Sequence, residues 1–184
     1  MNKEVLAFGI NRYDFPEDLA KKIVKKLNKN KDWEPSLVGG GNMGDLKISI
    51  RSSFGANLYG IDKDLATLAK SHITQCVKDY SKEFSIDTRK DEGLNVLKYE
   101  DYDKYEYHTD AGWNTYRVFS GLIYLNPQEY AGGETHFKYL DLGIKPSTPS
   151  VVLFPSNYMY LHSAMPLISG KKYVIVTWFN DSPQ

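Results

Sequence analysis

The stretch Tyr107-His108-Thr109-Asp110 carries two side chains suited to binding one metal ion together. If this stretch is extended, His108 and Asp110 point to the same face, because successive side chains of a strand alternate. A third ligand must come from elsewhere in the fold, and His162 in Tyr160-Leu161-His162-Ser163 is the candidate. Two imidazoles and one carboxylate form the set that holds Fe(II) and leaves coordination positions open. We therefore predict His108, Asp110 and His162 as metal ligands.

The composition is that of a folded globular protein. The 184 residues are 41% hydrophobic and 25% charged, enough for one domain with a core. Lys+Arg 23 balances Asp+Glu 23, so no overall field attracts nucleic acid or a membrane. Cys76 is the single cysteine, which excludes an internal disulfide.

The sequence shows no charged-then-apolar leader and no apolar run near the ~20 residues that cross a bilayer. We expect a cytoplasmic protein with no nucleic-acid partner and no membrane partner. The oligomeric state is not specified by the sequence, and a monomer is favoured.

The first half of the chain predicts a strand and two helices. Residues 4–10 favour a strand, and Asp14 can cap a helix over 16–29, where apolar residues recur every four positions. Asp62 opens a second helix over about 62–83 with the same kind of apolar stripe.

Two segments before the second helix are candidates for a mobile lid. Residues 39–44 are rich in glycine, which changes φ and ψ freely, and 52–60 follow as a second loop. We expect 1–93 to provide helical support and this lid, as part of a single domain over 1–184.

After residue 93, short runs rich in Val, Ile, Tyr and Phe alternate with turn residues. Strands are expected near 94–100, 104–109, 117–125, 134–139, 150–154, 159–163 and 171–180. Closely spaced strands without an intervening helical pattern imply a sandwich or a double-sheet jelly roll. The fold class is therefore mainly β, with 94–180 as its core and the N-terminal helices packed on one sheet.

The order of motifs resembles the prolyl 4-hydroxylase-like branch of the 2-oxoglutarate- and Fe(II)-dependent oxygenases. The likeness covers about 46–180 and is strongest over 94–180. The pieces that carry it are the His-x-Asp pair, Tyr124-Leu125-Asn126, Gly132-Gly133-Glu134-Thr135, His162 with Pro166 four residues on, and Lys172 ten residues after His162. The resemblance implies a double-stranded β-helix of the cupin type. It also implies Fe(II), with 2-oxoglutarate and O2 as cosubstrates and ascorbate as a candidate reductant.

Lys172 is the predicted partner for the far carboxylate of 2-oxoglutarate. It lies in an otherwise apolar strand, and a buried lysine without an anion is costly. Lys171 is the competitor, expected on the opposite face in water. The resemblance assigns hydroxyls of Tyr99, Tyr124 and Thr135 to the same cosubstrate; simple core packing is the alternative for both tyrosines.

Tyr105, Arg117 and Trp178 match positions that line the mouth of the site in peptide prolyl hydroxylases. Arg51 and Ser53 belong to a segment that resembles the family's Arg-x-Ser-x-Gly before the jelly roll, and they are also predicted to bind substrate. A Tyr and a Trp suit the apolar faces of a proline ring, and an arginine can donate to a peptide carbonyl. For Trp178, closing the barrel is an equal alternative. His136 after the Gly-Gly-Glu-Thr turn is either a surface residue or a contact near the far carboxylate.

The resemblance predicts hydroxylation of a prolyl residue in a peptide or protein, with 2-oxoglutarate converted to succinate and CO2. No catalytic side chain beyond the metal ligands is required. Two alternatives stay open: hydroxylation of another residue or a small molecule, and a non-catalytic cupin-like module that only binds metal. A buried cation aimed at a dicarboxylate favours the enzyme. Substrate identity and the position of hydroxylation on proline are not specified.

Overall fold

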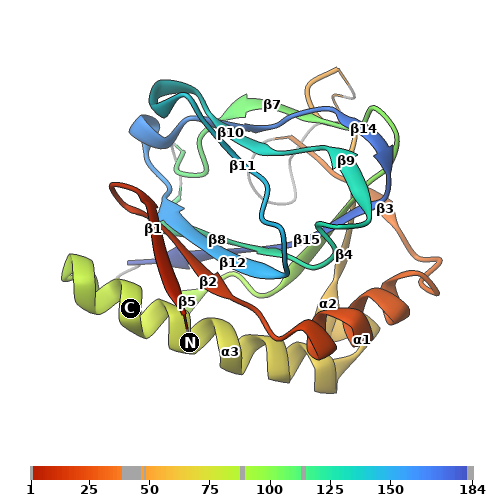
Figure 1. Ribbon diagram of the computed structural model, residues 1–184, viewed down its shortest axis with the longest axis horizontal. Helices are drawn as coiled ribbons and strands as arrows, with labels where there is room; N and C mark the ends of the chain where they lie inside the picture. The colour runs from red at the N-terminus through yellow and green to blue at the C-terminus, as the bar shows by residue number, and fades with distance from the viewer. Residues whose placement is uncertain (1, 39–46, 48, 88–89, 113–114, 182–184) are drawn as a thin grey trace.

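The structure is a computed structural model that describes residues 2–38, 47, 49–87, 90–112 and 115–181. Two facing β-sheets form its centre, and helices cover the outer face of the larger sheet (Figure 1). The larger sheet contains β1 (Lys3–Ala7), β2 (Ile10–Asp14), β3 (Glu34–Pro35), β4 (Phe54–Asn57), β5 (Lys90–Asp91), β6 (Asn95–Tyr99), β8 (Arg117–Tyr124), β12 (Ser150–Pro155) and β15 (Lys172–Asn180). Their order is β1-β2-β12-β8-β15-β6-β4-β3, with β5 paired to β15.

The smaller sheet carries the predicted metal-binding stretch. It contains β7 (Tyr105–His108), β10 (Thr135–Phe137), β11 (Leu142–Ile144) and β13 (His162–Ala164), in the order β11-β10-β13-β7. A separate antiparallel pair joins β9 (Tyr130–Gly132) to β14 (Leu167–Gly170). This arrangement is the double-stranded β-helix, or jelly roll, that the sequence predicts.

Both faces of the larger sheet are buried, and the two-residue period of each strand divides them. In β15, Tyr173 and Ile175 belong to the core under the helices, whereas Val174 and Val176 belong to the core between the sheets. Lys172 shares the face of Val174, so the same alternation directs this lysine between the sheets. A central strand buried on both faces reads as a continuous apolar run, as β15 does.

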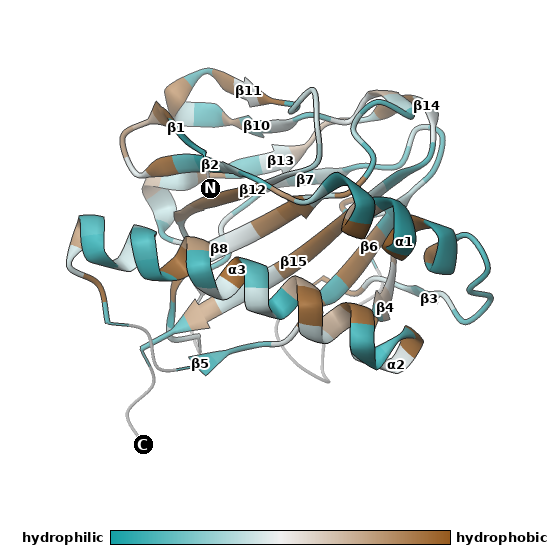
Figure 2. Cartoon of the chain, turned by 60° about the horizontal axis from the view of Figure 1, so that its bottom comes forward, coloured by the Kyte–Doolittle hydropathy of each residue, from teal (hydrophilic) through white to brown (hydrophobic). Residues whose placement is uncertain are grey.

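The helices are α1 (Glu17–Leu27), α2 (Leu58–Ile61) and α3 (Lys63–Phe84), with 3-10 turns η2 (Lys138–Leu140) and η3 (Tyr158–Tyr160). The long helix α3 lies across the outer face of β8 and β15 (Figure 2). The Asp62 side chain accepts from the Leu65 N–H and caps α3, as predicted. A Cβ at Gly121 would lie 3.3 Å from Ile73 Cδ1, so glycine lets α3 approach the sheet. No helix among the described residues has the length and apolar character needed to cross a membrane.

Several expected boundaries were wrong. Residues 4–10 are a hairpin rather than one strand: β1 ends at Ala7, Gly9 turns with φ +72°, and β2 follows. Asp14 belongs to β2 and accepts from Asn2, so α1 begins without a side-chain cap. Residues 159–163 begin as the 3-10 turn η3, and only from His162 does the chain become a strand. Short β9, β11 and β14 were missed, because three or four residues carry little periodicity.

The expected lid is replaced by regular structure where it can be seen. Residues 52–60 contain β4, which pairs with β6, and α2; the segment 39–44 lies outside the described residues. The part expected as helical support, 1–93, also adds β1–β2 at one edge of the larger sheet and β3–β4 at the other. Strands at a sheet edge are short and weakly patterned, so they resemble loops in the sequence.

Candidate active site

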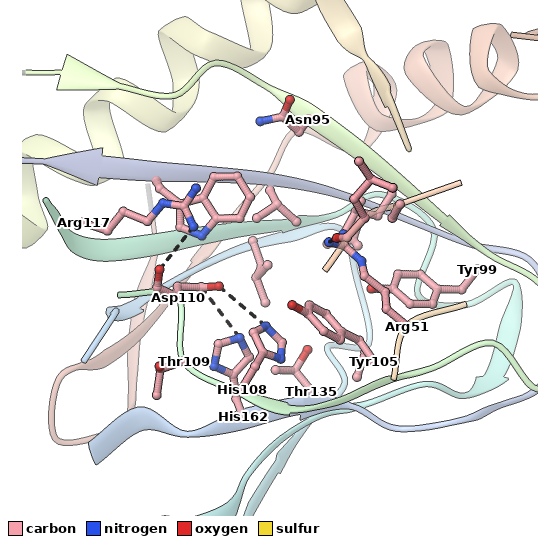
Figure 3. A pocket seen from close by; sticks show the side chains of 18 of the residues that line it. Arg51, Asn95, Tyr99, Tyr105, His108, Thr109, Asp110, Arg117, Thr135 and His162 are labelled. Carbon is pink, nitrogen blue, oxygen red and sulfur yellow. Dashed lines mark hydrogen bonds and ion pairs between the residues drawn. The ribbon is translucent and has the colours of Figure 1, made fainter. Parts of the chain in front are cut away.

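Three side chains that could bind a metal meet where the smaller sheet faces the larger one (Figure 3). His108 ends β7 and His162 begins β13, and the two residues are direct partners in the antiparallel register. Asp110 follows two residues after His108; its carboxylate oxygens lie 3.6 Å from His108 Nε2 and 3.7 Å from His162 Nε2. All the potential ligand atoms lie within 4.8 Å of one another. The tertiary structure thus brings His162 to the pair, as the sequence predicts.

Both imidazoles are held so that Nε2 faces the carboxylate. His108 Nδ1 lies 2.8 Å from the Glu106 carbonyl, and His162 Nδ1 lies 2.9 Å from the Tyr160 carbonyl. A carbonyl only accepts, so Nδ1 of each imidazole carries the proton of this hydrogen bond, and Nε2 is the nitrogen that faces the carboxylate. Burial lowers the pKa of His162 to about 4, and this imidazole is neutral at neutral pH. In both histidines Nε2 is therefore the nitrogen available to a metal.

The Asp110 carboxylate is buried and ionised. Burial by itself would raise its pKa, but His162, His108 and the hydrogen bond from Ser120 Oγ to Oδ2, 2.6 Å, together lower the pKa below its usual range. Ser120 was missed by sequence reasoning. Its only signal is a polar residue at an inward position of the apolar strand over 117–125.

The triad opens into a cavity of about 500 Å³ that follows β15. Lys172 and Trp178 both line it and lie six residues apart, on the same face of β15. Trp178 pairs with Ser120, the partner of Asp110, whereas Lys172 pairs with Tyr99. The cavity thus has a metal end, defined by His108, Asp110 and His162, and a lysine end, defined by Lys172, Thr135 and Tyr99.

Lys172 is buried at the lysine end with only a neutral acceptor. It is 2% exposed, and Nζ donates to the Gly133 carbonyl at 2.7 Å. Its Nζ also lies 5.1 Å from the Tyr99 ring centroid and 5.5 Å from that of Tyr124. Burial lowers the pKa of Lys172 to about 7, although Glu134 acts in the opposite direction. Among the described residues, no carboxylate forms an ion pair with it.

The neighbouring Lys171 lies on the other face, as predicted. Its side chain is 43% exposed, and Nζ pairs with Glu100 at 3.0 Å. An exposed, already paired lysine cannot serve a ligand between the sheets. Of these two neighbouring lysines, Lys172 is therefore the one that faces the cavity.

The predicted hydroxyls are arranged differently from one another. Thr135 and Tyr99 line the cavity, but the fully buried Tyr124 does not. Tyr124 donates to Thr135 Oγ1 at 2.7 Å, so the Thr135 proton is free to point into the cavity. Tyr124 therefore contacts Thr135, and its own hydrogen bond to the far carboxylate stays a prediction.

On the substrate side, Tyr105 and Arg51 line the cavity and Ser53 does not. The Tyr105 ring stacks on His108 with centroids 3.6 Å apart, and the Arg51 guanidinium lies 4.6 Å from the Tyr105 centroid. Arg51 donates to Ser53 Oγ at 3.0 Å and to the Leu37 carbonyl at 3.0 Å. Ser53 is 2% exposed and positions Arg51 rather than facing a substrate.

Arg117 and Trp178 also line the cavity, but the arginine is already occupied. Two parallel hydrogen bonds of 2.8 and 2.5 Å join its guanidinium to Glu92, a residue that sequence reasoning missed. A third reaches the Asp110 carbonyl at 3.2 Å, and the guanidinium lies 3.8 Å from the Trp178 centroid. The expected hydrogen bond from Arg117 to a peptide carbonyl stays a prediction. Glu92 already balances the charge of this arginine.

His136 does not belong to the site. It is absent from the described residues that line the cavity, and its Nδ1 hydrogen-bonds to Tyr107 OH at 2.7 Å. His136 neighbours Thr135 in β10, so alternation turns it to the opposite face. The surface interpretation is supported, and a contact near the far carboxylate is wrong.

Comparison with known families identifies the core of the chain. Residues 94–180 match the 2OG-Fe(II) oxygenase superfamily. This segment is a 2OG-Fe(II) oxygenase domain. It contains all three residues of the triad, together with Lys172, Thr135 and Tyr99.

The oxygenase domain is also similar to proteins named as prolyl hydroxylases. A putative prolyl 4-hydroxylase of Acanthamoeba polyphaga mimivirus is 26% identical over 151 residues, 67% of this chain and 62% of that protein. Probable prolyl 4-hydroxylase 9 of Arabidopsis thaliana is 29% identical over 122 residues, 50% of this chain and 42% of that protein. The matches therefore span about two fifths to three fifths of these relatives' length.

Solved structures show the same fold. A Trichoplax adhaerens prolyl hydroxylase in complex with a hypoxia inducible factor peptide fragment has a TM-score of 0.77 at 17% identity, covering 94% of this chain and 84% of that one. A Pseudomonas putida prolyl-4-hydroxylase has a TM-score of 0.74 at 16% identity, covering 95% and 94%. At these identities the likeness concerns the fold alone.

Proposed function

We propose that this chain hydroxylates a prolyl residue in a peptide or protein, using Fe(II), 2-oxoglutarate and O2. The observation that carries the proposal is a buried, unpaired Lys172 in the same cavity as the His108, Asp110 and His162 triad. Two neutral imidazole nitrogens and one carboxylate fit Fe(II). A cation at the far end fits a dicarboxylate that also reaches the metal. A module that only bound metal would have no use for this lysine.

When bound, Fe(II) with O2 and 2-oxoglutarate supplies oxidation of an unactivated C–H bond, with 2-oxoglutarate converted to succinate and CO2. The chain's own residues orient these groups. His108, Asp110 and His162 would hold the metal and leave coordination positions for further ligands. Lys172 and Thr135 bind the far carboxylate of the cosubstrate. The apolar wall of Leu97, Leu122, Val174 and Val176 excludes water from the reacting atoms.

The prolyl preference rests on the walls of the metal end and on the relatives. Tyr105 and Trp178 offer two aromatic rings to a proline ring near the triad. Both sequence relatives are named prolyl 4-hydroxylases, and one structural neighbour carries a peptide. Ascorbate as reductant, a cytoplasmic location and a monomeric state belong to the same proposal.

The test is formation of succinate from 2-oxoglutarate with Fe(II) and ascorbate, with and without a library of proline-containing peptides. We expect peptide-dependent succinate and a gain of one oxygen at proline, located by mass spectrometry; Asp110→Ala is the matched inactive control. Succinate with oxygen added to another residue or a small molecule would overturn the prolyl assignment. Bound iron without succinate under any condition would favour the non-catalytic module.

A further inference from the structure

The three triad residues come from the smaller sheet or the loop after it, but the Asp110 side chain is held from the larger sheet. Ser120 lies in β8, and Ser156 directly follows β12, the neighbour of β8. Ser120 is 0% exposed and Ser156 is 1% exposed, so water does not compete for either hydroxyl. These two serines play no part in the function proposed above.

The hydroxyls form a chain of short hydrogen bonds that ends on the carboxylate. Ser120 Oγ lies 2.6 Å from Asp110 Oδ2, and Ser156 Oγ lies 2.8 Å from Ser120 Oγ. A carboxylate only accepts, so the single Ser120 proton goes to Oδ2. Ser156 must then donate to Ser120 Oγ, because Ser120 has no second proton. One order of donors satisfies both bonds, and each bond strengthens the next.

The main chain of Ser156 fixes the same loop. Its carbonyl accepts from the Ala111 N–H at 2.9 Å, directly after Asp110, and its own N–H donates to the Val118 carbonyl at 3.0 Å. Ser156 therefore binds the loop of the smaller sheet to β8 through both its backbone and its side chain.

We propose that Ser120 and Ser156 are positioning residues that fix the Asp110 carboxylate through Oδ2, in the orientation in which it faces both His108 and His162. This inference rests on the proposed function, because it assumes a metal at the triad.

The experiment titrates the full chain with Co(II) alone and follows both affinity and the visible spectrum of bound Co(II). We expect Ser120→Ala to weaken Co(II) binding about 10- to 100-fold and to alter the spectrum, the size of effect seen when partners of metal ligands are removed. Ser156→Ala leaves the Ser120 bond in place and should weaken binding less, by about 3- to 10-fold. If Ser120→Ala does not fold, Ser156→Ala carries the test.

The matched control is Ser150→Ala, an equally buried serine of β12 whose hydroxyl bonds to the Thr148 carbonyl. It should leave affinity and spectrum unchanged. If both site variants fold and keep Co(II) affinity and spectrum like the control, the positioning role is overturned and the proposed function stands. If the unaltered chain binds no Co(II), the metal site itself is wrong, and with it both proposals.

Discussion

The two ends of the cavity present opposite charges to whatever binds there. The metal end holds the ionised Asp110 carboxylate beside the imidazoles of His108 and His162, so it offers a negative carboxylate to a cation. The lysine end holds Lys172 with a neutral carbonyl and two aromatic rings, so it offers a positive charge to an anion. The metal end is therefore suited to a cation, and the lysine end is suited to an anion.

The difference also extends to how rigidly each group is held. At the metal end, both imidazoles have backbone partners and Asp110 is anchored by Ser120. At the lysine end, Nζ has one hydrogen bond to Gly133, and two of its three protons remain for a ligand. A metal site requires fixed directions, whereas an ammonium binds a carboxylate as a point charge.

Removal of one metal ligand should abolish function at the metal end. His108→Ala or Asp110→Ala should reduce succinate formation by more than about 1,000-fold, because a group that acts as one unit fails when any member is lost. His136→Ala, a histidine of the same sheet outside the cavity, is the control and should retain activity. Full activity in either triad variant would contradict the assignment of the metal end.

Removal of the cation should act on the cosubstrate instead. Lys172→Ala should raise the KM for 2-oxoglutarate about 100-fold, since a charge-assisted hydrogen bond contributes about 1.5–3 kcal/mol. Lys171→Ala, the exposed neighbour paired with Glu100, should leave this KM unchanged. The measurement is succinate formation against 2-oxoglutarate concentration. If Lys171→Ala raised the KM and Lys172→Ala did not, the residue that binds the cosubstrate would be Lys171.

The lysine end should also respond to pH in a defined direction. The pKa of Lys172 in the free protein is lowered to about 7 by burial, so above this pH the site is increasingly neutral. A dicarboxylate binds the charged form, and binding must take up a proton. The KM for 2-oxoglutarate should therefore rise roughly tenfold between pH 7 and 8.5. Lys172→Arg, which stays charged, should remove the rise; a flat profile in the unaltered chain would contradict the unpaired lysine.

The smallest effect should come from the ion pair between Glu92 and Arg117, next to the metal end. Glu92→Gln weakens the bidentate contact that holds Arg117 against Trp178 and the Asp110 carbonyl. For this partly exposed pair we expect a loss of about 1 kcal/mol, or about 2–4 °C in Tm, by calorimetry. The control Glu106→Gln alters a surface pair with Lys104 and should leave Tm unchanged. An equal Tm shift in both variants would show that the Glu92–Arg117 pair contributes no more stability than a surface pair.

The sequence could predict what depends on local periodicity. The two-residue period of β15 places Lys172 between the sheets and Lys171 outside, whatever the partners of this strand are. The spacing of His108 and Asp110 likewise directs both side chains to one place. The apolar stripe of α3 and its Asp62 cap follow from the residues of the helix itself. These features were predicted correctly because each depends on a few neighbouring residues.

Contacts between distant strands were decided only by the tertiary structure. The bonds from Ser120 to Asp110, from Arg117 to Glu92 and from Tyr124 to Thr135 join residues that lie 10, 25 and 11 positions apart. Each joins β8 to a loop or to the other sheet, so it depends on the register of β8 and on how the two sheets pack; a shift of one residue would turn every side chain of β8 to the other face. Register is set by the packing of both sheets, which no short stretch contains. The sequence by itself determined which groups are available for chemistry, and the packing of the two sheets decided which of them meet.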